Sequence, residues 1–154
     1  MPKVITKRVE VHVIRETDGG YEYLLLKRSP DKKYPNLWQM VSGSIDDGEK
    51  SYETAVRELK EETQLDVEEL FIFPRVSEFY DFFEEDTINL VPVFIAKVGN
   101  NEVIISDEHV EHKWVDFAEA YRVLDRIQWK ENSALLEKIL NDNLLFNTLQ
   151  KIEI

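Results

Sequence analysis

Three glutamates near the middle of the chain, Glu58, Glu61 and Glu62, have a spacing that could bind a metal ion. On a helix, residues three and four positions apart project toward one side, so the three carboxylates would lie together. Like charges this close repel one another unless a cation lies between them, and Mg²⁺ or Mn²⁺ prefers oxygen ligands. Such an ion can bridge carboxylate and phosphoryl oxygens. Acidic helix faces are also common as solvated surfaces. The surrounding residues therefore decide between a metal site and a solvated face.

The residues around these glutamates predict a strand end, a turn, an acidic loop and an amphipathic helix between Gly43 and Leu65. We expect the helix to cover about residues 52–63. Ser51 is the expected N-cap, and Glu53 would complement the positive end of the helix dipole. Apolar residues at helical spacing predict one buried face. They are Tyr52, Ala55, Val56 and Leu59.

This segment resembles the Nudix box, a pattern of glycine, arginine and glutamates at fixed spacing. The residues in register with it are Gly43, Glu49, Arg57, Glu58, Leu59, Glu61, Glu62 and Leu65. The departure is Gln64, where the family pattern has glycine and often needs a left-handed backbone, which glutamine adopts at about 1 kcal/mol. We expect a small loss of stability or a different helix exit, with the ligating side chains upstream unaffected.

The resemblance implies a role for each matching side chain. Glu58 and Glu62 match the principal metal ligands, and Glu61 matches a further ligand or a catalytic contact to metal-bound water. Arg57 matches an arginine that pairs with acidic residues and orients the helix, and Glu49 matches a structural or outer-shell carboxylate. For Arg57 and Glu49, a fold-stabilising pair is as good an explanation as a catalytic role. Gly43 would let the backbone approach metal and phosphate closely.

Shorter matches outside the box resemble the bacterial dihydroneopterin triphosphate pyrophosphatases, also described as dATP-preferring Nudix enzymes. They are Lys7-Arg8, Leu26-Lys27-Arg28, Leu37-Trp38-Gln39, Val41-Ser42-Gly43-Ser44, Glu108-His109, Lys113-Trp114, and Trp129 with Asn132. The matching positions suggest Lys7 and Arg28 as phosphate contacts, because both are cations. Glu108 matches a metal ligand or general base supplied from a loop. Strand-edge charge for the two cations, and a solvated loop acid for Glu108, are equal alternatives.

Other substrate contacts suggested by these matches are Ser42, His109 and Asn132. The run from Phe79 to Phe83 could stack on a purine or pterin ring, with Phe79 and Tyr80 as the candidate contacts. Alternation along a strand divides this run between two faces, and we expect one face to be core. The acidic residues 84–86 that follow would add negative charge near the substrate, which argues against a triphosphate.

The elements that must position these residues follow from periodicity and turn signals. Residues 6–14 alternate valine with polar residues, as in a half-buried strand, and residues 21–27 form a second strand joined to it by Asp18-Gly19-Gly20. Further strands are expected at 37–41, 67–73, 75–83, 89–98 and 110–115, and helices at 118–126 and 132–145. This order and the resemblance imply an α/β (α+β) fold, a Nudix-type α/β/α sandwich around a mixed β-sheet, as one domain over residues 1–154.

Composition narrows the function further. The chain has 154 residues, 43% of them hydrophobic, and a net charge of -12, which disfavours binding to a nucleic acid duplex. It has no cysteine, which excludes disulfides, thiolate nucleophiles and cysteine-based zinc sites. The N-terminus lacks a signal-peptide pattern, and no apolar run approaches a membrane span. We expect a cytoplasmic protein whose partner is a small nucleotide or pterin triphosphate. The sequence does not decide whether the protein is a monomer or a homodimer.

The expected reaction is Mg²⁺-dependent hydrolysis of a pyrophosphate bond in a nucleoside triphosphate-like substrate, either dihydroneopterin triphosphate or a (d)NTP. Mn²⁺ is an alternative cofactor. One alternative is a Nudix enzyme for nucleotide sugars or dinucleoside polyphosphates, because the box does not distinguish substrates. Another is a non-catalytic metabolite-binding Nudix domain, although such domains usually lose box carboxylates and this chain keeps all of them. The sequence leaves the substrate, the number of metal ions and the general base undetermined.

Overall fold

The computed structural model describes residues 1–83 and 85–154. Its strands are β1 (Lys3–Ile5), β2 (Arg8–Thr17), β3 (Gly20–Arg28), β4 (Trp38–Gln39), β5 (Val41–Ser44), β6 (Val67–Ile72), β7 (Ser77–Asp81), β8 (Thr87–Val91), β9 (Val93–Val98), β10 (His109–Val115) and β11 (Lys151–Ile152). Its helices are α1 (Ser51–Thr63), α2 (Phe117–Val123), α3 (Ile127–Leu140) and α4 (Asn143–Phe146).

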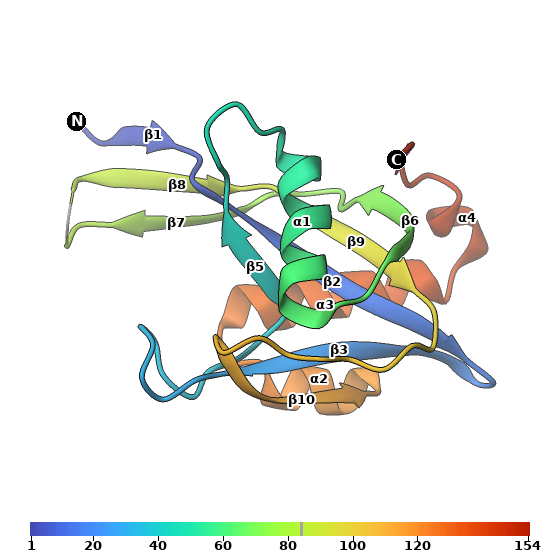
Figure 1. Ribbon diagram of the computed structural model, residues 1–154. Coiled ribbons are helices and arrows are strands. Elements are labelled where there is room, and N and C mark those ends of the chain that lie inside the picture. Colours follow the sequence, from blue (N-terminus) through green and yellow to red (C-terminus); the bar gives the residue numbers. More distant parts are fainter. Residues whose placement is uncertain (84) are drawn as a thin grey trace.

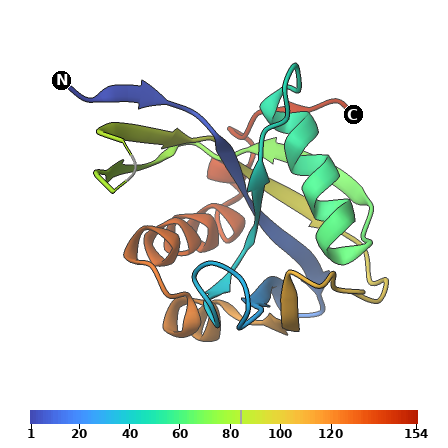
Figure 2. The ribbon, with the colours of Figure 1, turned by 60° about the vertical axis from the view of Figure 1, so that its left-hand side comes forward.

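Two sheets organise the described part of the chain. The larger, mixed sheet has the order β10-β3-β2-β9-β6-β11, with β4 paired to β3 and β5 paired to β2, and the smaller has the order β1-β8-β7. Helix α1 covers one face of the large sheet and α2 and α3 cover the other, while β7 and β8 extend beyond it as a hairpin (Figures 1 and 2). This confirms the predicted α/β/α sandwich around a mixed sheet. None of the helices described is long and apolar enough to cross a membrane.

The central strand β2 has different neighbours along its two halves. Residues 8–11 pair with β5, and residues 14–17 pair with β3 in the predicted hairpin. Within residues 1–83 and 85–154, β5 pairs with β2 alone, so its other edge is open. The strand that leads into α1 is therefore an edge strand of the large sheet.

The structure differs from three predicted element boundaries. Lys50, with extended φ and ψ of -80° and 148°, is the N-cap of α1 in place of Ser51, and its N–H donates to the Glu53 carboxylate at 2.9 Å. The strand predicted at 89–98 is interrupted by Pro92, which lacks an N–H for a sheet, so β8 and β9 belong to different sheets. The predicted helix at 132–145 begins earlier, at Ile127, and Asp142 caps a separate α4.

Strand β2 is buried on both faces, although its alternation predicted a half-buried strand. Val9, Val11 and Val13 pack in the cluster beneath α1. Glu10 and His12 point to the opposite side and are also buried, at 8% and 3% exposure. Polar residues in this strand therefore face a second layer of protein, not solvent.

His12 should make the stability of the protein depend on pH. Its ring stacks on Phe73 at 5.9 Å, its Nε2 has no hydrogen-bond partner among the described residues, and burial lowers its pKa from 6.5 to about 4. The unfolded chain therefore binds a proton at this residue across a range in which the folded protein does not. Above pH 6.5 His12 does not reduce the free energy of unfolding. As the pH falls toward 4, this one group lowers the free energy of unfolding by roughly 3 kcal/mol.

The substitution His12→Leu is expected to flatten this part of the pH profile, measured by urea unfolding between pH 4 and pH 7.5. His112→Leu removes an exposed imidazole from the same sheet and serves as the control. If the wild type and His12→Leu lost stability in parallel over this range, His12 would not be the group that titrates.

Candidate active site

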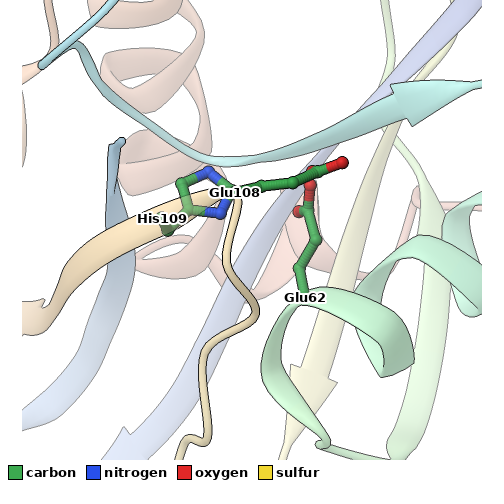
Figure 3. Close-up of side chains that lie close together, drawn as sticks. All are labelled: Glu62, Glu108 and His109. Atoms are coloured by element: carbon green, nitrogen blue, oxygen red, sulfur yellow. The ribbon is translucent and has the colours of Figure 1, made fainter. Parts of the chain in front are cut away.

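The structure brings Glu62, Glu108 and His109 together. Glu62 comes from the last turn of α1, and the other two come from the loop and first residue of β10 (Figure 3). Their ligand atoms all lie within 4.8 Å of one another. Glu62 is 2% exposed and its Oε2 has no hydrogen-bond partner in the described chain, whereas Glu108 is exposed. Two facing carboxylates with an unpaired buried oxygen fit a hard divalent cation.

Electrostatics at this cluster favour an added positive charge. Burial, followed by the charges of Glu58 and Glu108, raises the pKa of Glu62 well above its usual 4.5. Burial also raises the pKa of Glu58, against the effect of the Arg57 guanidinium. Burial lowers the pKa of His109 to about 4, so its ring is neutral at pH 7. The folded chain thus holds an acidic cluster in which like charges repel one another, an arrangement that a bound cation would stabilise.

Gly43 packs directly against the Glu58 carboxyl group. A Cβ at this position would overlap the carboxyl carbon of Glu58. The close backbone approach expected at Gly43 is therefore made to a side chain of α1. The absence of a side chain on β5 lets Glu58 lie against the strand, beside Glu62 one turn further along the helix.

Arg57 ties α1 to the preceding loop and to β5. Its guanidinium donates to Glu49 at 2.8 and 3.0 Å, to Glu58 at 3.0 Å, to Glu61 at 3.2 Å and to the carbonyl oxygen of Ser44 at 2.9 Å. Arg57 and then Thr54 lower the pKa of Glu49 to about 2. Glu61 is 58% exposed along its side chain, and it lies outside the cluster of Glu62, Glu108 and His109.

Gln64 adopts the left-handed conformation that the glycine of the box would take. Its φ and ψ are 62° and 13°, and its N–H donates to the Lys60 carbonyl at 2.9 Å. The helix exit is thus kept despite the side chain. We expect Gln64→Gly to raise the free energy of unfolding by about 1 kcal/mol in urea titrations, with Gln64→Ala as the control. Equal stability of the two variants would contradict this explanation.

The two cations expected to contact phosphate lie at the end of β3 and just before β2, and Ser42, a further expected substrate contact, lies on β5. Arg28 ends β3 opposite His109 in the β-ladder, and its Nε donates to the Lys33 carbonyl at 2.7 Å. Lys7 is exposed, and its carbonyl accepts from Ile45 just after β5. Ser42 is buried on β5, and its hydroxyl accepts from Arg8 at 2.7 Å.

The aromatic run is exposed on both faces, so the expectation that one face is core is wrong. Phe79 is 44% exposed on one face and Tyr80 58% on the other, and Phe82 stacks on Phe83 at 4.3 Å. The cause is the projection of the β7–β8 hairpin beyond the body of the protein (Figure 2). Of the acidic residues after this run, Glu84 lies outside the described residues, and Asp86 accepts from the Tyr80 hydroxyl at 2.7 Å.

Asn132 is fully buried in α3, so any ligand contact by it would have to be made deep in the fold. Its Nδ2 donates to the Ser77 hydroxyl at 3.0 Å, and its Oδ1 accepts from Arg75 at 2.8 Å. These contacts connect Asn132 to β7 at the base of the hairpin.

Sequence reasoning missed two polar residues near the site. The Gln39 amide donates to Nε2 of His109 at 3.1 Å, and only a short family match contained this residue. Glu10 accepts from Ser77 and Trp129 at 2.8 Å each. Alternation in β2 assigned Glu10 to a solvent face, so the only available signal was misleading.

Comparison with known proteins gives a consistent set of matches. The family model described as NUDIX domain matches residues 6–138. The asymmetrical bis(5'-nucleosyl)-tetraphosphatase of Caenorhabditis elegans is 29% identical over 136 residues, covering 88% of this chain and 94% of the relative. The dihydroneopterin triphosphate diphosphatase of Escherichia coli is 29% identical over 150 residues, covering 90% and 97%. A crystal structure of the C. elegans Ap4A hydrolase in a binary complex has a TM-score of 0.74 at 25% identity, covering 88% of this chain and 97% of its own.

Proposed function

Because this chain belongs to the NUDIX family and is a Nudix pyrophosphohydrolase, we propose that it hydrolyses a pyrophosphate bond in a pterin or nucleoside triphosphate with the aid of Mg²⁺. The observation that carries the proposal is the convergence of Glu62 and Glu108, from separate elements, around an unpaired buried oxygen. Nothing in the packing of the surrounding core requires two carboxylates there, whereas a divalent cation would use both.

Each residue of the site has a role in this proposal. Glu58 and Glu62 would hold the cation from α1 and Glu108 from the loop before β10, with Glu61 as a further ligand and Mn²⁺ as an alternative to Mg²⁺. When bound, the cation supplies positive charge to phosphoryl oxygens and acidifies an attacking water. Glu108 is the exposed member of the cluster and is the first candidate to accept the proton of that water, with Glu61 the second. Arg57 fixes Glu58 and Glu61 by direct hydrogen bonds.

The substrate class rests on charge and on the relatives. Lys7 and Arg28 supply local positive charge to phosphates in a chain whose net charge is -12. Phe79 and Tyr80 offer exposed rings for stacking. Ser42 on β5, His109 at the start of β10 and Asn132 on α3 are the further proposed contacts.

A second candidate substrate is a dinucleoside polyphosphate. Relatives named as asymmetrical bis(5'-nucleosyl)-tetraphosphatases match this chain as closely as the pterin enzymes do. The stacked pair of Phe82 and Phe83 at the hairpin tip offers an additional surface for a second base.

The test is a product-release assay across dihydroneopterin triphosphate, the NTPs and dNTPs, Ap4A and nucleotide sugars, with Mg²⁺, with Mn²⁺ and with EDTA. We expect cation-dependent turnover that is highest for a triphosphate, with pyrophosphate or phosphate as a product. Highest turnover of Ap4A would select the second candidate. Absence of cation-dependent turnover for every compound would overturn the proposed function.

A further inference from the structure

Glu10 is a buried carboxylate that the hydrolytic site does not use. It is 8% exposed, and within residues 1–83 and 85–154 it forms no ion pair, although the charges of Arg8 and Arg126 act on it. Taking a carboxylate out of water without a paired cation is unfavourable by several kcal/mol. Residues kept at such a disadvantage are concentrated at functional sites.

Hydrogen bonds fix Glu10 as an acceptor on both oxygens. Oε1 accepts from the Ser77 hydroxyl and Oε2 from the Trp129 indole N–H, both at 2.8 Å. The Ser77 hydroxyl donates to Glu10 while its oxygen accepts from Asn132 at 3.0 Å, and Asn132 in turn accepts from Arg75. A tryptophan N–H can only donate. Both partners of Glu10 therefore act as donors, and the network holds its two oxygens in a fixed orientation as acceptors.

The described residues leave two acceptor positions of Glu10 unused. A carboxylate has about four lone-pair sites, and two are occupied by Ser77 and Trp129. A ligand that meets this group must therefore present N–H donors. Guanine and pterin rings carry two adjacent donors, a ring N–H and a 2-amino group. Adenine presents one donor beside an acceptor nitrogen, which would face the carboxylate unfavourably.

The position of Glu10 suits a ring attached to phosphates at the acidic cluster. Glu10 pairs with Ser42 across the β2–β5 ladder, and the backbone N–H of Ser42 donates to Glu62. One strand thus separates the two carboxylates, and the edge of β5 away from β2 is open among the described strands. A substrate that crosses this edge would place its phosphates on the α1 side and its ring on the α3 side, where Glu10 is 8% exposed. Phe79, exposed on the same face of β7 as Ser77, lies where such a ring could stack.

We propose that Glu10 is a specificity-determining residue whose carboxylate binds the ring N–H and 2-amino group of a guanine-like or pterin-like substrate. This inference rests on the proposed function. It assigns Ser77 and Trp129 as positioning residues for Glu10, and Asn132 as a positioning residue for Ser77.

The experiment compares kcat/KM for GTP, ITP and ATP in the wild type and in Glu10→Gln. ITP differs from GTP only by lacking the 2-amino group. One hydrogen bond to a charged group corresponds to a change of about 10- to 100-fold in affinity. The kcat/KM of the wild type should therefore be higher for GTP than for ITP by that factor. Glu10→Gln should reduce the preference to within about threefold, mainly by raising KM for GTP, and should lower kcat/KM for GTP much more than for ITP. A purely structural role would lower turnover of all three substrates together.

Glu22→Gln makes the same change of charge in the same sheet, at a partly exposed ion pair with Arg15, and is the matched control. Should Glu10→Gln not fold, Ser77→Ala removes one of the two donors that orient Glu10 and should weaken the GTP preference in part. A wild-type GTP to ITP ratio near one, or a ratio unchanged in both variants, would overturn the inference. Lack of turnover of every triphosphate would instead count against the proposed function.

Discussion

Glu62→Gln is expected to lower kcat by roughly a thousandfold while leaving the fold intact. The amide keeps the shape of the side chain but removes the charge that would hold a cation at the most buried point of the cluster. A cation supplies several kcal/mol to phosphoryl transfer, and about 4 kcal/mol corresponds to a factor of a thousand. The measurement is single-substrate turnover at saturating Mg²⁺, with circular dichroism to verify the fold.

The same substitution, Glu62→Gln, should increase the stability of the protein when no cation is present. The pKa of Glu62 is raised in the folded protein, chiefly by burial, so folding favours the protonated form. The contribution of this group is present below pH 4.5 and is lost as the pH rises through the folded pKa. In EDTA at pH 8, Glu62→Gln should therefore be more stable than the wild type by about 1–3 kcal/mol. Added Mg²⁺ should stabilise the wild type and not the variant.

Glu53→Gln is the control for this experiment. It changes an exposed carboxylate on the same helix, and glutamine can keep the hydrogen bond to the Lys50 N–H. Turnover and stability of this control should stay close to those of the wild type. Near-wild-type turnover by Glu62→Gln would remove the basis for the metal site proposed here.

The part of the site that lies within one helix could be predicted from the sequence. Glu58 and Glu62 are one turn apart, so their proximity follows from helix geometry once the helix is recognised. Arg57 pairs with acidic residues as the family resemblance implied, because its partners at 49, 58 and 61 lie within its reach along α1 and the preceding loop. Even the irregular Gln64 kept the helix exit of the pattern.

Residues brought to the site by tertiary structure were harder to predict. Glu108 and His109 reach Glu62 because β10 pairs with β3, and nothing local in the sequence fixes that pairing. Periodicity in β2 correctly placed Glu10 and His12 on one face, but periodicity does not say whether a second layer covers that face. For the same reason, strand propensity in residues 79–83 did not reveal that their hairpin extends into solvent.

The buried polar residues of this fold share a physical consequence. Glu62, Glu10 and His12 are each less favourable in the folded protein than an apolar residue of similar size. Two of them carry proposed functions, and His12 packs on Phe73 between β2 and the segment after β6. A ligand that neutralises Glu62 or pairs with Glu10 should therefore increase the stability of the protein.

Gly43→Ala is expected to lower divalent-cation affinity by about 10- to 100-fold through a single methyl group. The added Cβ would overlap the Glu58 carboxyl carbon, so Glu58 must rotate away from β5. The backbone of Gly43 does not have a positive φ, so alanine causes no conformational strain of its own. Turnover should fall strongly at low Mg²⁺ and recover partly at high Mg²⁺, because the other carboxylates are still in place.

The control for this change is Gly19→Ala, since a Cβ at Gly19 would meet no atom within 4 Å and its φ is not positive. A double-mutant cycle then tests the mechanism. If Gly43→Ala acts by displacing Glu58, it should have little further effect on cation affinity in a Glu58→Ala background. Equal effects of Gly43→Ala with and without Glu58 would show that the methyl group disturbs the site by another route. Isothermal titration with Mn²⁺ measures the four affinities directly, without depending on the identity of the substrate.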